Sequence, residues 1–197
     1  YIVFEKYSTY GGIWNNALDT TRLQTHKKYY QYDDFPMPKH YNIHPNKKEI
    51  LEYLNSVIIK FNLNNIFYNY KVVKTKYINN IWYTSIINLK NNKIINIKSK
   101  YLIICNGFYN KIKSICKLQN NIYNKFNTNK LQIIHISKLN KYNLDLFNNK
   151  KVVIIGNGAS ACDVLNILEN KSNKLYIIYK HDKYYIKKYI FNISTSI

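Results

Sequence analysis

The chain has 197 residues, 46% of them hydrophobic, so it is long enough and apolar enough to form one or two domains with a core. This composition excludes a disordered chain, and no apolar run approaches the roughly 18 residues of a membrane-spanning helix. The start shows no secretory signal pattern. Because the sequence begins at Tyr1, in an apolar stretch without methionine, we expect it to be a piece of a longer protein.

The formal net charge of +20 would ordinarily favour nucleic acid or an anionic surface as a partner. Of the 30 basic residues, however, only Arg22 is arginine, the residue that binds phosphate and guanine best. The chain is rich in residues with A/T-rich codons, namely Lys, Asn, Ile, Tyr and Phe, and holds only 5 glycines and 3 prolines. We therefore interpret the charge as nucleotide bias and predict no nucleic-acid partner.

The cysteines, Cys105, Cys116 and Cys162, are odd in number and far apart. Their spacing fits neither a zinc site nor a disulfide framework. We expect reduced, buried thiols, no metal and a cytoplasmic protein.

The first half of the chain alternates between short apolar runs and breaks. A short buried strand is predicted to end near Glu5, and Gly11-Gly12 then breaks the chain. After an irregular stretch, Pro45 suits the start of a helix over about 46–62. The apolar face of that helix is predicted from residues three and four apart: Leu51, Leu54, Ile58 and Phe61.

Three β-rich runs follow, at 66–77, 81–90 and 93–99. Asn-Asn pairs separate them, which indicates an antiparallel meander. Tyr101–Cys105 is a continuous apolar run and is predicted to be a buried parallel strand. Leu131–Ile134 is a further candidate strand.

The glycines are concentrated at the ends of apolar runs, most sharply in the last of these. Lys151–Ile155 reads as a buried strand, and Gly156-Asn157-Gly158-Ala159-Ser160-Ala161 follows at once. A helix and a second strand, Leu175–Tyr179, complete a unit of about 30 residues, the length of a dinucleotide-binding fingerprint. The helix face that packs on the strands is predicted from Ala161, Val164 or Leu165, and Leu168.

Each small residue of this loop has a physical role in dinucleotide binding. Gly156 allows the tight turn, Gly158 lets the backbone approach a pyrophosphate, and Ala161 lets helix and strand pack closely. The anion then lies on the amides that open the helix, near Ala159 and Ser160. The alternative is a strand–helix corner that merely required glycine.

The end of the second strand should select the cofactor. An NAD site usually has Asp or Glu there, whereas this chain has Lys180, with His181 and Lys183 nearby. An ammonium attracts the 2′-phosphate of NADPH, so we predict NADPH. Asp182 is the competing residue, because a shift of two positions would restore a carboxylate.

Several motifs occur in an order that resembles flavin-containing monooxygenases, above all the plant and fungal branch, over nearly the whole chain. They are Gly11-Gly12-Ile13-Trp14, Leu23-Gln24-Thr25, Asp34-Phe35-Pro36, Asn106-Gly107-Phe108-Tyr109 and the Gly156–Ala161 loop. The resemblance implies an α/β protein with two Rossmann-like dinucleotide-binding domains, for FAD and NADPH, both partial here. Residues 1–125 would be the FAD-binding domain, with the meander at about 66–99, and 126–197 the NADPH-binding domain.

The resemblance also implies roles for single residues. Glu5 would hold the adenosine ribose of FAD, and Gln24 would lie near the flavin ring as the catalytic side chain. Ser160 would help to hold the NADPH pyrophosphate. The remaining FAD contacts would come from Gly11, Gly12, Trp14, Leu23, Asn106 and Gly107.

The chain also departs from the family pattern. The FAD-binding GxGxxG loop should precede Tyr1, and the half that completes the FAD and substrate sites should follow the last residue. The signature F-x-G-x-x-x-H-x-x-x-[FY] is reduced to Asn129, Leu131, His135 and Leu139, and Ile112 replaces a usual proline. His135 is therefore either a signature residue or a structural one. We do not expect this chain alone to hold FAD tightly.

By resemblance, the full protein would be a monooxygenase in which NADPH reduces FAD and O2 then gives a flavin hydroperoxide. That species would oxygenate a small molecule at a soft nitrogen or sulfur atom. The alternatives are a Baeyer–Villiger monooxygenase acting on ketones and a truncated or degenerate relative without activity.

Overall fold

The computed structural model describes residues 1–107, 132–184, 189–190 and 193–194. The chain forms two compact units, one from Tyr1–Asn15 with Leu51–Asn110 and one from Asn16–Ile50 with Lys111–Ile197. The predicted domain boundary at 125 lies outside the described residues. Segment 16–50, assigned from the sequence to the FAD-binding domain, groups with the second unit.

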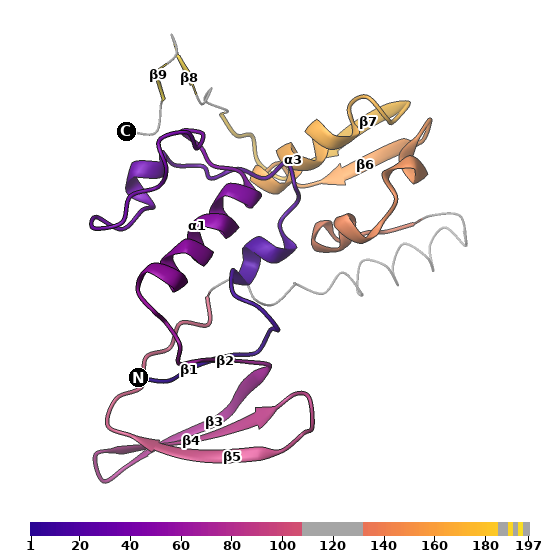
Figure 1. The fold of residues 1–197 in the computed structure, drawn as a ribbon. Coiled ribbons are helices and arrows are strands. Elements are labelled where there is room, and N and C mark those ends of the chain that lie inside the picture. Colours follow the sequence, from indigo (N-terminus) through magenta and orange to yellow (C-terminus); the bar gives the residue numbers. More distant parts are fainter. Residues whose placement is uncertain (108–131, 185–188, 191–192, 195–197) are drawn as a thin grey trace. The chain divides into compact units, whose positions relative to one another are not determined.

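The first unit contains a parallel strand pair (Figure 1). β1 (Val3–Glu5) pairs with β2 (Ile66–Tyr68), and Phe4 lies 5.9 Å from Phe67 between ring centroids. The predicted strand is confirmed, but its burial was predicted wrongly, because Val3 is 42% exposed. Within the described part of the chain this sheet has two strands, so both of its edges are open.

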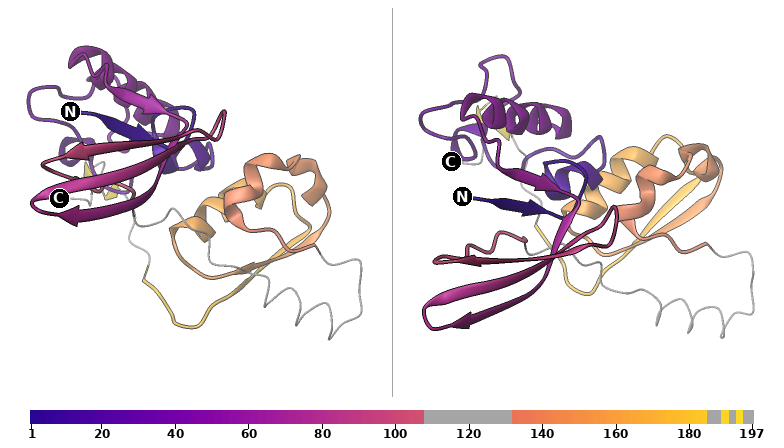
Figure 2. Two further views of the ribbon diagram at one scale, coloured as in Figure 1. Left: turned by 90° about the horizontal axis from the view of Figure 1, so that it is seen from below. Right: turned by 60° about the horizontal axis from the view of Figure 1, so that its bottom comes forward.

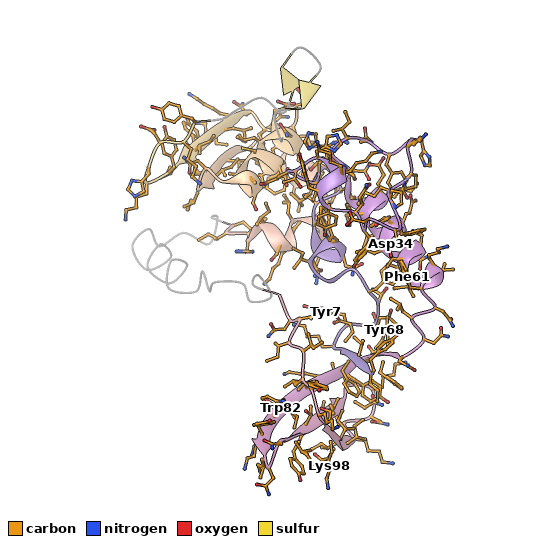
Figure 3. All side chains as sticks on the ribbon, turned by 90° about the vertical axis from the view of Figure 1, so that its left-hand side faces the viewer. Tyr7, Asp34, Phe61, Tyr68, Trp82 and Lys98 are labelled. Atoms are coloured by element: carbon orange, nitrogen blue, oxygen red, sulfur yellow. The ribbon has the colours of Figure 1, made fainter. Side chains whose placement is uncertain are left out.

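An antiparallel meander of β3 (Tyr70–Ile78), β4 (Ile81–Asn88) and β5 (Ile94–Ser99) completes the first unit, as predicted. Trp82 and Lys98, labelled in Figure 3, belong to its second and third strands. Asn79 and Asn80 both have positive φ, 47° and 61°, the conformation of a two-residue hairpin turn that Asn tolerates. Asn69, with φ 63°, divides the predicted run 66–77 into β2 and β3.

The predicted buried strand at Tyr101–Cys105 is wrong. This stretch has no regular structure, and Ile103 is 84% exposed. The expectation of a buried thiol is also wrong at Cys105, which is exposed. A continuous apolar run forms a buried strand only where neighbouring strands and covering layers are present, and the described residues supply none here. Residues 132–134 likewise have no regular structure, while Leu131 lies outside the described residues.

Helix α1 (Lys47–Lys60) confirms the prediction for 46–62. Its most buried side chains are Ile50, Tyr53 and Val57. The predicted face of Leu51, Leu54, Ile58 and Phe61 lies beside that stripe and is half-buried or, at Phe61, exposed. Both sets have helical spacing, so the period alone could not separate them.

Hydrogen bonds between backbone groups organise segment 16–50 of the second unit. The Leu23 amide donates to the Pro45 carbonyl (2.8 Å) and the Lys27 amide to that of Ile43 (2.8 Å). The Lys27 ammonium also donates to a set of carbonyls: Pro38, Lys39 and Tyr41.

Short 3₁₀ helices occur in both units, at Gly12–Asn16 (η1), Lys27–Tyr29 (η2), Ile136–Lys141 (η3) and Leu144–Phe147 (η4).

The predicted strand–loop–helix–strand unit is present in the second unit. β6 (Lys151–Ile155) and β7 (Lys174–Ile178) pair in parallel, joined through α3 (Ala159–Leu168). Ala161 and Leu168 are buried, which confirms the predicted helix face, and Figure 2 shows α3 against one face of the strand pair. A short antiparallel pair, β8 (Tyr189–Ile190) with β9 (Ile193–Ser194), follows.

A reciprocal capping box begins α1. The Asn46 side chain accepts from the Glu49 amide (3.0 Å), and the Glu49 carboxylate accepts from the Asn46 amide (2.8 Å). Burial by itself raises the pKa of Glu49, but hydrogen bonds from Asn46 and Asn42, with the charge of Arg22, outweigh it and hold this pKa below 4.5. The ionised carboxylate therefore stabilises the helix start.

Asn46→Ala should cost about 1 kcal/mol of stability, the usual size of a lost N-cap, whereas Asn55→Ala on the exposed side of α1 should not destabilise.

Because the folded pKa of Glu49 is lowered, its contribution to stability is present above pH 4.5 and declines as the pH falls through that lowered value. Thermal unfolding followed by circular dichroism should show that the wild type has a higher melting temperature than Glu49→Gln, and that this difference shrinks on acidification. A difference in melting temperature that does not change with pH would contradict this assignment.

Candidate dinucleotide-binding site

The turn that follows β6 depends on Gly156. Its φ is +108°, a conformation that side chains rarely adopt, although a Cβ there would meet nothing within 4 Å. Its amide donates to the Ile178 carbonyl at the end of β7 (2.7 Å). Glycine is thus required by the backbone conformation, and the turn is held at the carboxyl ends of both strands.

Gly158 has a different role, because its φ of −86° is open to any residue. It is the N-cap of α3 without a side-chain cap, and a Cβ added to it would meet only the Lys183 ammonium, at 4.0 Å. The Ala161 and Cys162 amides both donate to the Gly158 carbonyl. The preceding amides, of Ala159 and Ser160, are those that an α-helix leaves without an acceptor of its own.

The loop closes against the residues that follow β7. The Asn157 side chain donates to the His181 carbonyl (2.8 Å). An open hollow of about 380 Å³ lies at this end of the strands, lined by Ile155, Gly156, Ile178, Tyr179 and Lys180. The role of Lys180 as the cofactor-selecting residue stays a prediction.

The arrangement suits an anion in two ways. The start of α3 presents backbone donors and the positive end of the helix dipole. The Lys183 ammonium lies beside Gly158, a proximity that the spacing of the sequence did not indicate. The start of α3 and the Lys183 ammonium therefore present donors and positive charge beside Gly158, while the binding roles of residues 156–161 and 180 stay predictions.

The predicted flavin residues of the first unit lie at strand and turn ends. Glu5 ends β1, and its carboxylate accepts from the Tyr7 amide (2.9 Å). Burial raises the pKa of Tyr68 at the end of β2, and electrostatic repulsion from Tyr10 and Glu5 raises it further. Tyr7 and Tyr68 are labelled in Figure 3.

The Gly11-Gly12 pair of this unit has positive φ throughout. Gly11 has φ +97°, and a Cβ there would overlap the Leu51 side chain, whereas Gly12, with φ +51°, has open space around it. The Trp14 amide donates to the Gly11 carbonyl (3.0 Å), which fixes the turn. The backbone conformation therefore requires glycine at position 11, and any side chain there would also have to displace that of Leu51.

The other predicted flavin residues are divided between the units. Asn106 and Gly107 are exposed and belong to the first unit, and Gly107 has φ +71°. Leu23, which is buried, and Gln24, which is exposed, belong to the second. Their roles in flavin binding stay predictions.

The remnant of the family signature has a structural use at His135. Its Nδ1 accepts from the Ser137 amide (3.2 Å) and so caps η3, while Leu139 is buried in the same short helix. Asn129, Leu131 and Ile112 lie outside the described residues. In the described part of the chain, no three His, Cys, Asp or Glu side chains gather as metal ligands, and no helix could span a membrane.

Comparison with known proteins identifies the family. A family model described as flavin-binding monooxygenase-like matches residues 3–192. The chain belongs to this family. Among curated proteins, no sequence gives a significant match.

Solved structures share the fold of this flavin-binding monooxygenase-like chain. Tmm from a Pelagibacter strain is 20% identical, with a TM-score of 0.71 over 92% of this chain and 44% of its own. The S-allyl-L-cysteine S-oxygenase of Allium sativum is 17% identical, with a TM-score of 0.68 over 89% and 44%. OTEMO in complex with FAD and NADP is 19% identical, with a TM-score of 0.63 over 89% and 33%.

The chain therefore spans less than half the length of these three structures. The predicted fold class, α/β dinucleotide-binding architecture with an antiparallel meander, is confirmed.

The two loop glycines should respond differently to alanine. Gly156→Ala should lower stability by about 1–2 kcal/mol, because its side chain would be forced into positive φ. Gly158→Ala should change stability by less than about 1 kcal/mol and weaken NADP⁺ binding about tenfold, because its methyl group would face the approaching diphosphate. Unfolding curves and calorimetric titration measure the two effects. Equal binding by Gly158→Ala and the wild type would contradict the assignment.

Proposed function

We propose that this family member acts as an FAD- and NADPH-dependent monooxygenase that oxygenates a small molecule at nitrogen or sulfur. The main supporting observation is the glycine loop between β6 and α3, beside an open hollow that Lys180 helps to line. The chain that contains this loop matches the flavin-binding monooxygenase-like family. The similarity to an S-oxygenase and to a complex with FAD and NADP supports the proposal.

For NADPH, the residues of the second unit fit the cofactor. The Ala159 and Ser160 amides would hold the pyrophosphate, and the bare backbone of Gly158 would let it approach. Lys180 would pair with the 2′-phosphate, a contact that NAD⁺ lacks. Ala161 would keep α3 close to the strands so that these donors stay in place.

For FAD, Glu5 would take the ribose hydroxyls, which requires a carboxylate acceptor. Gly11, Gly12, Trp14, Asn106 and Gly107 would contact FAD. Leu23 would pack against FAD. The side-chain amide of Gln24 would donate a hydrogen bond near the flavin ring, where O2 reacts. FAD, when bound, supplies the electron transfer from NADPH to O2.

We also propose that the protein is cytoplasmic, as expected from the number and spacing of its cysteines.

Ketone oxygenation of the Baeyer–Villiger type would use the same two cofactors, so only the substrate separates it from this proposal. A truncated or degenerate relative would bind nucleotide or nothing, and its purified full-length protein would show neither flavin absorbance nor NADPH-dependent O2 uptake.

Lys180 provides the direct test of cofactor selection. Lys180→Met should weaken NADP⁺ binding about tenfold and leave NAD⁺ binding within about twofold, because only NADP⁺ has a phosphate for the ammonium. Calorimetric titration with both dinucleotides measures this.

Lys174→Met is the matched control, because Lys174 begins β7 at the opposite end of the same strand and lies over the Tyr176 ring. Equal losses for both nucleotides, or the same loss in the control, would indicate a general effect of positive charge and refute the role of Lys180.

A further inference from the structure

A side-chain hydrogen bond joins segment 16–50 to helix α3 within the second unit. The Thr21 hydroxyl donates to the Asp163 carboxylate at 2.8 Å, across 142 residues of sequence, and both side chains are partly buried. A hydrogen bond to a carboxylate is stronger than one between neutral groups. It is therefore a substantial connection between two stretches of chain that are remote in sequence.

Asp163 lies four residues after Ala159, one helical turn from the proposed pyrophosphate site. Because consecutive turns of a helix move together, a shift at the first amides of α3 displaces this carboxylate. Thr21 lies two residues before Leu23 and three before Gln24. The hydrogen bond is thus placed to carry a displacement from the glycine loop into the Leu23–Gln24 segment.

Further contacts surround Thr21 and stiffen the segment. The Ala17 carbonyl accepts from Asn140 (2.7 Å) and from the Lys47 ammonium (3.0 Å), which also pairs with Asp19 (3.0 Å). The Thr21 carbonyl accepts from the Lys47 amide (3.2 Å). A segment held at several points moves as a body rather than absorbing a pull at one residue.

We propose that Asp163 is a positioning residue, which through Thr21 couples occupancy of the dinucleotide site to the placement of Leu23 and Gln24. The inference rests on the proposed function, in which these two residues lie along the flavin. The carboxylate acts through the hydroxyl and contacts neither cofactor. Binding of NADP⁺ then tightens the Leu23–Gln24 segment.

Hydrogen exchange measured by mass spectrometry, with and without NADP⁺, tests this coupling. In the wild type, NADP⁺ should slow exchange about three- to tenfold at the start of α3 and also at the Leu23 and Lys27 amides. Thr21→Val and Asp163→Ala should keep the effect at α3 and lose it at Leu23 and Lys27. Asp163→Asn should retain both, because the amide oxygen still accepts from Thr21.

Asp145→Asn is the control, since it removes an ion pair with Lys171 (3.3 Å) elsewhere in the same unit and should behave as the wild type. If NADP⁺ protects α3 but not Leu23 in the wild type, the coupling is refuted while the proposed function stands. The coupling is likewise refuted if Thr21→Val retains protection at Leu23. If the wild type binds neither NADP⁺ nor NAD⁺, the proposed function and the coupling fail together.

Discussion

The hydrogen bond from the Gly156 amide to the Ile178 carbonyl determines the geometry of the candidate site. It closes the left-handed turn after β6 onto the end of its parallel neighbour β7. Without that turn the chain could not leave the strand and enter α3 within three residues. The start of the helix and the end of the second strand are therefore brought to one edge of the pair.

The chemistry of the site follows from this placement. Backbone amides at Ala159 and Ser160 open the helix, and Lys180 and Lys183 follow the second strand. The Lys183 ammonium lies beside Gly158 at the helix start, and Lys180 is among the residues that line the hollow at the strand ends. In the proposed function, a diphosphate would accept hydrogen bonds from the backbone donors at the helix start. The high lysine content of the whole chain does not by itself produce such a site, since the backbone donors are independent of composition.

Local features were predictable from the sequence. The glycine loop, its flanking strands and the packed face of α3 are encoded within about 30 consecutive residues, so their pattern suffices. Tyr101–Cys105 illustrates the opposite case, because an apolar run becomes a strand only when partners exist elsewhere. The buried stripe of α1 likewise depends on what packs against it. Asn69 divided a predicted strand because a single residue with positive φ leaves no mark in hydrophobic periodicity.

The contact of Thr21 with Asp163 had no signal in the sequence at all. Neither residue belongs to a recognisable motif, and their separation exceeds any local pattern. Such contacts emerge only when segment 16–50 and the glycine-loop unit fold together, which the predicted boundary at 125 did not anticipate. The roles of Glu5 and Gln24 stay at the level of resemblance, since they depend on a cofactor and not on the fold alone.

Nuclear magnetic resonance of the ¹⁵N-labelled chain, titrated with NADP⁺, tests the central claim most directly. We predict saturable shifts at the Gly158, Ala159 and Ser160 amides, with smaller changes at Lys180 and none in the meander β3–β5. Shifts scattered over lysine-rich surfaces without saturation, or no change at the start of α3, would contradict it.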